Sequence, residues 1–146
     1  AALPIGKAEV IEEGDDVAIF GLGALLPMAR ELAEALKQRG FSAAVINPRF
    51  VKPLDRDLLA EYAARAAVII TLEDHVLMGG FGSTVLEALS DMQIDVPVVR
   101  VGWPDRFIEH GKPEQLRAKY GISVEGALER LAPYLKLSAR RRLIAR

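Results

Sequence analysis

The sequence contains no cysteine among its 146 residues, which excludes disulfide bridges and thiolate metal sites. Its net charge is only −1, so no overall electrostatic field attracts nucleic acid or an acidic membrane. No apolar run reaches the roughly 20 residues of a membrane-spanning helix, and no signal peptide is visible. We therefore expect a cytoplasmic protein that binds neither nucleic acid nor membrane.

The residues that are present are typical of a globular protein. Hydrophobic residues make up 51% and charged residues 27% of the chain, and its length suffices for one domain with a core. We expect residues 1–146 to form that single domain. The chain opens with Ala1 rather than methionine, and we interpret it as a piece of a longer protein.

Short apolar runs alternate with helical patterns along the chain. The runs at 17–22, 41–46, 67–72 and 96–101 predict buried parallel strands. Residues 8–12 alternate weakly and precede a turn, so we expect an antiparallel edge strand in a hairpin with the next strand. This order predicts an α/β, three-layer sandwich with a mainly parallel sheet of about five strands.

Local signals place the helix ends. Gly40 is a stop for the first helix, whereas Asp55 and Ser123 are N-caps of later ones. Pro133 stands inside the last helical pattern, and we expect it to kink or end that helix. The arginine-rich end, 137–146, is predicted to be a frayed basic tail.

The most informative segment follows the strand at 67–72. Acidic residues and a histidine come directly after that strand, and a glycine-rich turn then leads into a helix. In open α/β sheets, ligands and partners meet the fold at the carboxyl ends of the strands. The candidate site residues are therefore Glu73, His75, Met78, Gly79, Gly80, Phe81, Gly82 and Ser83.

The glycines of this turn allow two interpretations. They let the backbone pack closely, or they expose a helix N-terminus that holds an anion. No lysine follows Gly82, as it would in a phosphate loop, and we favour close packing. At least one glycine should then have positive φ or a contact too short for a Cβ. Met78 and Phe81 should form an exposed apolar patch.

Strand alternation places Glu73 and His75 on one face and Asp74 on the other. A carboxylate beside an imidazole could form an acid–base pair, but no third metal ligand is identifiable. We expect a structural or interface role for His75 and for His110. The residues alone thus predict no catalytic residue and no metal site.

Three ordered blocks, 47–55, 73–83 and 102–111, resemble the C-terminal domain of the 1-deoxy-D-xylulose-5-phosphate synthase family. These are transketolase-like enzymes that use thiamine diphosphate. Residues 3–7 also resemble the start of that domain. The resemblance extends to about Leu135 and does not include the arginine-rich end.

The resemblance implies that the full enzyme condenses pyruvate, with loss of CO2, with glyceraldehyde 3-phosphate. The product feeds isoprenoid and thiamine biosynthesis. Thiamine diphosphate and Mg²⁺ are implied in the N-terminal domain and the substrate residues in the middle one. No catalytic or cofactor-binding residue then falls on this chain, which alone should be inactive. Its implied partners are the remaining domains and the second subunit of a homodimer, met through the turn at 73–83.

Two alternatives remain open at this point. The C-terminal docking domain of a 2-oxo-acid dehydrogenase β subunit shares a Gly-Gly-Phe-Gly turn with this chain. That family reads Asp-Leu-Arg-Thr where this chain has 47–50, and it has a Pro-x-Pro where this chain has 103–107. Both differences favour the synthase. The third possibility is a free-standing, anion-binding regulatory domain.

Overall fold

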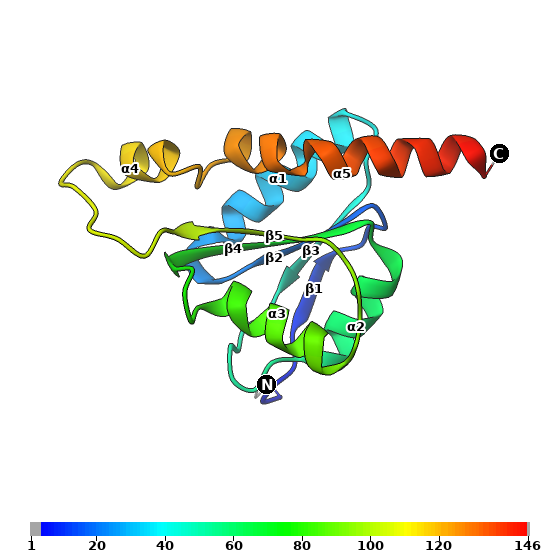
Figure 1. The fold of residues 1–146 in the computed structure, drawn as a ribbon, viewed down its shortest axis with the longest axis horizontal. Helices are drawn as coiled ribbons and strands as arrows, with labels where there is room; N and C mark the ends of the chain where they lie inside the picture. Colours follow the sequence, from blue (N-terminus) through cyan, green and yellow to red (C-terminus); the bar gives the residue numbers. More distant parts are fainter. Residues whose placement is uncertain (1–3, 146) are drawn as a thin grey trace.

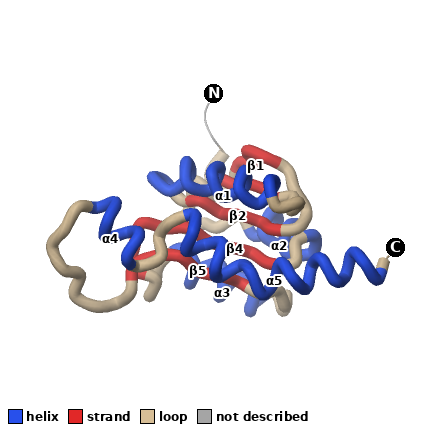
Figure 2. Tube along the Cα trace, turned by 90° about the horizontal axis from the view of Figure 1, so that it is seen from above, coloured by secondary structure: helices blue, strands red, loops and turns tan. Residues whose placement is uncertain are grey.

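The computed structural model describes residues 4–145, apart from the side chains of residues 138, 141 and 142. One five-stranded sheet lies between two helical layers (Figures 1 and 2). The strand order is β1-β3-β2-β4-β5, in which β1 is antiparallel to β3 and the other pairs are parallel. This confirms the predicted α/β sandwich. The strands are β1 (Glu9–Glu12), β2 (Val17–Gly21), β3 (Ala43–Asn47), β4 (Val68–Val76) and β5 (Val98–Trp103).

Helices cover both faces of the sheet. α1 and α5 pack on one face, and α2 and α3 pack on the other (Figure 1). None of the described helices combines the length and the apolar character needed to cross a membrane. The helices are η1 (Gly23–Leu25), α1 (Leu26–Gln38), α2 (Arg56–Arg65), α3 (Phe81–Asp91), α4 (Pro113–Lys119) and α5 (Val124–Ile144).

The central strand β2 shows why the apolar runs are continuous. Val17 and Ile19 belong to the core under α1 and α5, whereas Ala18 and Phe20 belong to the core under α2 and α3. Successive side chains of a strand point to opposite faces, so a strand covered on both faces needs apolar residues at every position.

The predicted helix ends are confirmed. Gly40 adopts φ +86° just beyond α1, a conformation that costs glycine little. The Asp55 carboxylate accepts the Leu58 N–H at 3.1 Å and so caps α2. Ser123 Oγ accepts the Gly126 N–H at 3.0 Å at the start of α5. Each of these signals acts within a few residues, which is why the sequence alone identifies them.

The expected hairpin between β1 and the next strand is wrong. β1 pairs with β3, with Glu9 opposite Asn47, and β2 lies on the far side of β3. The connecting turn crosses the start of β3 at Gly14, where a Cβ would overlap the backbone of Ala43. The missing side chain of Gly14 thus lets the chain pass over β3 and reach the next position in the sheet.

Pro133 does not end the last helix, which was one of its two predicted effects; the other, a kink, stays a prediction. α5 contains Pro133 and continues to Ile144. A proline removes one intrahelical N–H donor, but Leu131 and Leu135 on either side of it are buried in the core. Their burial holds both halves of the helix against the domain. The fraying of the tail at 137–146 stays a prediction.

The antiparallel direction of β1 determines at which edge of the sheet the first described residues lie. Because Glu9 lies opposite Asn47, β1 begins at the edge of the sheet where β3 ends. The incoming segment, residues 4–8, contacts the loop that follows β3: Gly6 packs against Pro53, and the Ala8 N–H donates to Asp55 at 2.9 Å. The described start of the chain therefore lies at the carboxyl edge of the parallel strands.

Asp55 should be a stability determinant because it accepts hydrogen bonds from both the incoming segment and α2. We expect Asp55→Ala to lower the free energy of unfolding by about 2 kcal/mol, because two backbone N–H groups lose their acceptor. The exposed Asp57 in the first turn is the control, and Asp57→Ala should cost about 0.5 kcal/mol. Urea denaturation of both variants measures this, and equal losses would contradict the double role.

Candidate functional site at the carboxyl end of β4

β4 is longer than predicted. It continues to Val76, which pairs with Trp103 after a register shift, and the Leu77 N–H donates to the Trp103 carbonyl at 2.9 Å. Residues 73–75 are therefore strand residues, and the turn proper is 77–80. The predicted alternation is confirmed: Glu73 faces α3, whereas Asp74 contacts residues on the α1 and α5 side.

The buried carboxylate of Glu73 closes the N-terminus of α3. Its side chain is completely buried, and its two oxygens accept the N–H groups of Phe81 at 2.9 Å and Gly82 at 2.6 Å. These donors have no intrahelical partner, and the positive end of the helix dipole favours a negative charge there. The anion at this helix N-terminus is thus a side chain of the protein itself.

Gly80 leaves the space that this carboxylate occupies, and Gly82 allows an equally close approach to β4. A Cβ on Gly80 would overlap the Glu73 carboxylate and lie 2.6 Å from the Val76 carbonyl oxygen. A Cβ on Gly82 would lie 2.8 Å from Thr71 Oγ1. Real Cβ atoms do not approach other atoms so closely, so the close-packing interpretation of these glycines is confirmed. The packing partners belong to this same domain.

Two other glycines are required here for different reasons, Gly79 within the turn and Gly102 on the neighbouring strand β5. Gly79 adopts φ +69° with open space around it, so it is needed for its backbone conformation rather than for room. Gly102 on β5 was not among the predicted site residues. A Cβ there would lie 3.1 Å from Glu73 Cγ and 2.9 Å from the His75 carbonyl oxygen. Its role depends on the β4–β5 pairing, which the local sequence does not reveal.

Only part of the predicted apolar patch is exposed. Met78 is 69% exposed, but Phe81 is 1% exposed and stacks at a tilt on Phe20 with ring centroids 6.3 Å apart. The prediction for Phe81 is wrong because the first residue of α3 points under the sheet into the core. His75 is solvent-exposed, and its Nδ1 lies 2.7 Å from the Val76 carbonyl oxygen and 4.0 Å from Glu73 Oε1.

Ser83 fixes the turn rather than offering a nucleophile. Its hydroxyl donates to the Leu77 carbonyl at 2.8 Å and accepts from Arg100 Nη1 at 3.2 Å. An acid–base role for the His75–Glu73 pair is also unsupported, because both Glu73 oxygens already accept backbone N–H groups. The predicted residues thus come together, but what they build is a closed turn.

On the opposite face of β4, Asp74 ties the strand to α4. It accepts from Arg117 Nη2 and from Trp103 Nε1, each at 2.7 Å. The hydrogen bond from Arg117, and then that from Trp103, holds the pKa of Asp74 below its usual value. Sequence reasoning missed this contact because Arg117 lies far along the chain from Asp74.

The loop between β5 and α4, residues 104–112, extends beyond the end of the sheet (Figure 1). Arg106 donates to the Tyr120 hydroxyl at 2.9 Å, and that hydroxyl donates to Glu109 at 2.6 Å. Glu109 also pairs with Lys119, and these bonds, the one from Lys119 first, lower the pKa of Glu109 to about 2. Phe107, at 87% exposed, lies between the two pinned residues.

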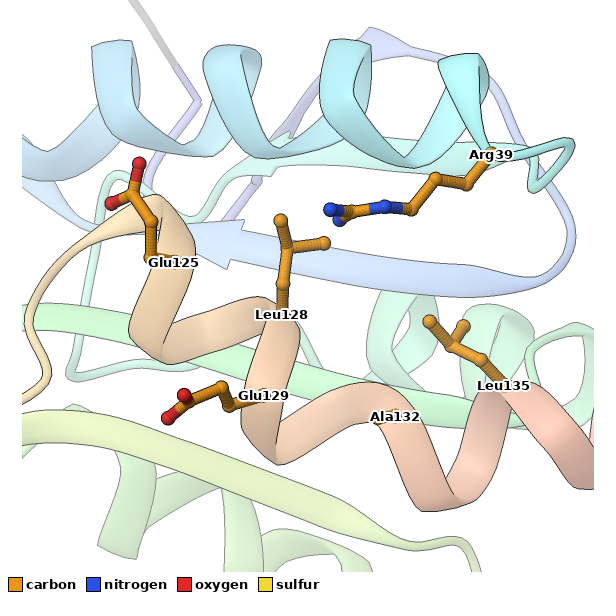
Figure 3. A pocket seen from close by; sticks show the side chains of 6 residues that line it. All are labelled: Arg39, Glu125, Leu128, Glu129, Ala132 and Leu135. Carbon is orange, nitrogen blue, oxygen red and sulfur yellow. The ribbon is translucent and has the colours of Figure 1, made fainter.

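The described residues provide no group of three or more His, Asp or Glu side chains that could hold a metal ion. A pocket of about 400 Å³ lies between α1 and α5, away from the carboxyl end of β4 (Figure 3). Its leucines point from α5 toward α1, and an arginine at the end of α1 extends along the space between the helices. The lining residues are Arg39, Glu125, Leu128, Glu129, Ala132 and Leu135.

Comparisons with known proteins agree with this architecture. The family described as the C-terminal domain of transketolase matches residues 6–126. A protein of Acidobacterium capsulatum named 1-deoxy-D-xylulose-5-phosphate synthase is 67% identical over 138 residues, which cover 94% of this chain and 22% of that protein. One of the same name from Methylacidiphilum infernorum is 57% identical, covering 92% of this chain and 21% of that protein.

A solved structure gives the same result for the fold. The structure described as a split gene transketolase, an inactive tetramer of four β subunits, superposes with a TM-score of 0.83 at 36% identity. The superposition covers 94% of this chain and 44% of that one. The present chain spans about a fifth of the length of the curated relatives that it matches.

The buried carboxylate should matter for the stability of the isolated chain. We expect Glu73→Ala to lower the free energy of unfolding by about 3 kcal/mol, because two buried N–H groups lose their acceptors. Glu73→Gln, which keeps one acceptor oxygen, should cost about half as much. Glu87→Gln on the exposed side of α3 is the control. Urea denaturation in which Glu73→Ala resembles this control would contradict the role of Glu73.

Two neighbouring glycines allow a matched comparison of space and backbone conformation. Gly80→Ala should destabilise the chain strongly, by about 3 kcal/mol, because its Cβ meets the Glu73 carboxylate and a backbone carbonyl. Gly79→Ala meets open space and should cost only about 1 kcal/mol for its left-handed backbone. Thermal melts of the two variants measure the difference. The reverse order would show that the turn is not packed inside the domain.

Proposed function

This chain belongs to the transketolase C-terminal domain family, and we propose that it is the C-terminal domain of a 1-deoxy-D-xylulose-5-phosphate synthase. The observation that carries the proposal is the 67% identity to a protein of that name over 94% of the chain. In the full enzyme the reaction joins pyruvate, after loss of CO2, to glyceraldehyde 3-phosphate and supplies isoprenoid and thiamine biosynthesis. The full enzyme is proposed to be cytoplasmic.

The proposed role of this domain is contact rather than catalysis. Thiamine diphosphate and Mg²⁺ would bind in the remaining domains, since no acidic or histidine cluster of the described residues fits a metal ion. Glu73 and Ser83, two of the three polar side chains among the predicted site residues, already have partners within the domain. We therefore expect the isolated chain to be inactive.

Topology supports contact through the carboxyl edge of the sheet. The chain comes in at this edge, next to the loop that follows β3, which supports contact with the preceding domain on this side. Met78 and His75 are exposed at the same edge. The proposed partners are the remaining domains of the polypeptide and the second subunit of a homodimer. The tetramer described for the split gene transketolase supports association in this family.

The two alternatives are not favoured. The relatives reported above are named as the synthase, which disfavours the docking domain of a 2-oxo-acid dehydrogenase. A free-standing anion-binding domain is disfavoured by the structure of α3, whose first free N–H groups already bind the Glu73 carboxylate. An external anion would have to displace a buried side chain at that helix end.

A domain exchange tests the proposal. We expect a chimaera in which this chain replaces the corresponding region of the Acidobacterium capsulatum synthase to keep most of its turnover of pyruvate and glyceraldehyde 3-phosphate. The high identity should preserve the contacts between the domains. The measurement is product formation together with the oligomeric state in solution.

Three controls complete the exchange. The unmodified synthase sets full activity, and the synthase truncated before this domain should be inactive. The isolated chain, titrated calorimetrically with thiamine diphosphate and Mg²⁺, should bind neither. A chimaera that is folded and dimeric but inactive would contradict the assignment, as would micromolar binding of the cofactor by the isolated chain.

A further inference from the structure

Phe107 stands out among the exposed apolar side chains. We propose that Phe107, held on the pinned loop 104–112, is an anchor that inserts into an apolar recess on the preceding part of the same polypeptide. This inference rests on the proposed function, because it names the surface through which the domain would contact the rest of the enzyme. Phe107 thus takes over the contact role that the sequence predicted for most of the turn at 73–83.

The exposure of Phe107 has no explanation inside the domain. At 87% exposed it contributes almost nothing to either core of the described structure. A phenylalanine ring buries a large apolar area when it is covered, and aromatic side chains are enriched at the centres of interfaces. Burial of this ring by a partner would thus contribute binding energy without any loss of folding energy.

The loop is also held in one shape before any partner binds. Arg106, directly before Phe107, donates to the Tyr120 hydroxyl, and its guanidinium lies 5.1 Å from the centre of that ring. Glu109, two residues after Phe107, accepts from the same hydroxyl and pairs with Lys119. Ordering a flexible loop opposes binding, so a loop that is already ordered presents its anchor at lower entropic cost.

Tyr120 is fixed in turn to the body of the domain. Its ring packs at a tilt on Trp103, with centroids 5.7 Å apart, and Trp103 donates to Asp74 on β4. A continuous series of side-chain contacts thus joins β4 to the loop through Trp103 and Tyr120. The ionic and aromatic residues around the loop therefore hold it to the domain, while Phe107 itself stays exposed.

The position of the loop points to the preceding part of the polypeptide as the partner. The loop follows the carboxyl end of β5, and the incoming segment lies at the same edge beside β3. Four strand spacings separate β1 from β5, which is about 19 Å. A preceding domain of about 150 residues has a radius of gyration of about 15 Å and is wide enough to reach both points.

The amount of chain outside the structure agrees with this. The relatives are about five times longer than the part that matches this chain, so the full polypeptide has enough further chain to provide the surface that Phe107 would contact. The last turn of α5 carries the exposed apolar residues Leu143 and Ile144, and α5 runs toward the end of the molecule opposite the loop 104–112 (Figure 1). They serve as controls of similar exposure.

The test places a photo-activated benzoylphenylalanine at position 107 of the full-length protein. We expect cross-linking to peptides that precede residue 1 of this domain, within a single polypeptide, so that the apparent mass on a denaturing gel does not double. The same probe at position 144, which is 85% exposed in the native chain, should not cross-link to those peptides. Cross-links from position 107 to the second subunit, or none at all, would overturn the proposal.

A substitution provides a second, independent measurement. Phe107→Ser should leave the melting temperature of the 146-residue chain within about 2 °C of the native value, because an exposed side chain contributes little to the fold. In the full-length protein the same change should raise the rate of proteolytic cleavage at residues 4–8 about tenfold, the effect of losing one strong contact. Ile144→Ser should change neither, and an unchanged cleavage rate in Phe107→Ser would overturn the proposal.

These readouts are independent of catalysis. If the full-length protein forms the cross-link from position 107 but does not turn over pyruvate and glyceraldehyde 3-phosphate, the proposed reaction fails and the anchor stands. If turnover is present and the cross-link is absent, the anchor fails and the proposed reaction stands.

Discussion

Two hydrogen bonds, from the first two free N–H groups of α3 to the Glu73 carboxylate, determine the structure of the carboxyl edge of this domain. A buried carboxylate is tolerated only where donors surround it, and here both oxygens have one. These bonds require β4 to extend past Glu73, α3 to begin at Phe81, and the turn between them to fold back. Glycine at position 80 follows from the same requirement, since a side chain there would displace the carboxylate. Glycine at positions 82 and 102 follows from the close approach of the surrounding elements, because a Cβ would meet Thr71 in the first case and the His75 carbonyl in the second.

The sequence predicted the parts of the fold that depend on local or repeated signals. The buried strands were identifiable because a strand such as β2, covered on both faces, is apolar at every position. Helix ends such as the cap at Asp55 depend on neighbours within three residues. The partner of β1 was not predictable in this way, because the crossing at Gly14 depends on a contact with Ala43. Pro133 does not end its helix although proline is a local stop signal, since burial of its neighbours outweighs one missing hydrogen bond.

For the candidate site, the sequence located the right edge of the sheet but not the direction in which its residues point. Glycine spacing indicates close packing, yet it does not say whether the packing partner is another subunit or the chain itself. For Gly80 the answer is Glu73, seven residues earlier, on a strand longer than its apolar run. Phe107 lay inside a block that resembles the synthase family, but only its exposure in the folded domain distinguishes it from a core residue.

The edge position of β1 has a consequence for how this domain can be inherited. β1 is bonded to one neighbour only, and of the residues before it Gly6 packs on the loop after β3 while Ala8 lies against the core under α2 and α3. A break in the gene upstream of residue 4 would cut no strand pair and would leave the contacts of Gly6 and Ala8 in place. The domain is thus a unit that recombination or gene fission can detach and move, with its hydrophobic cores carried along intact.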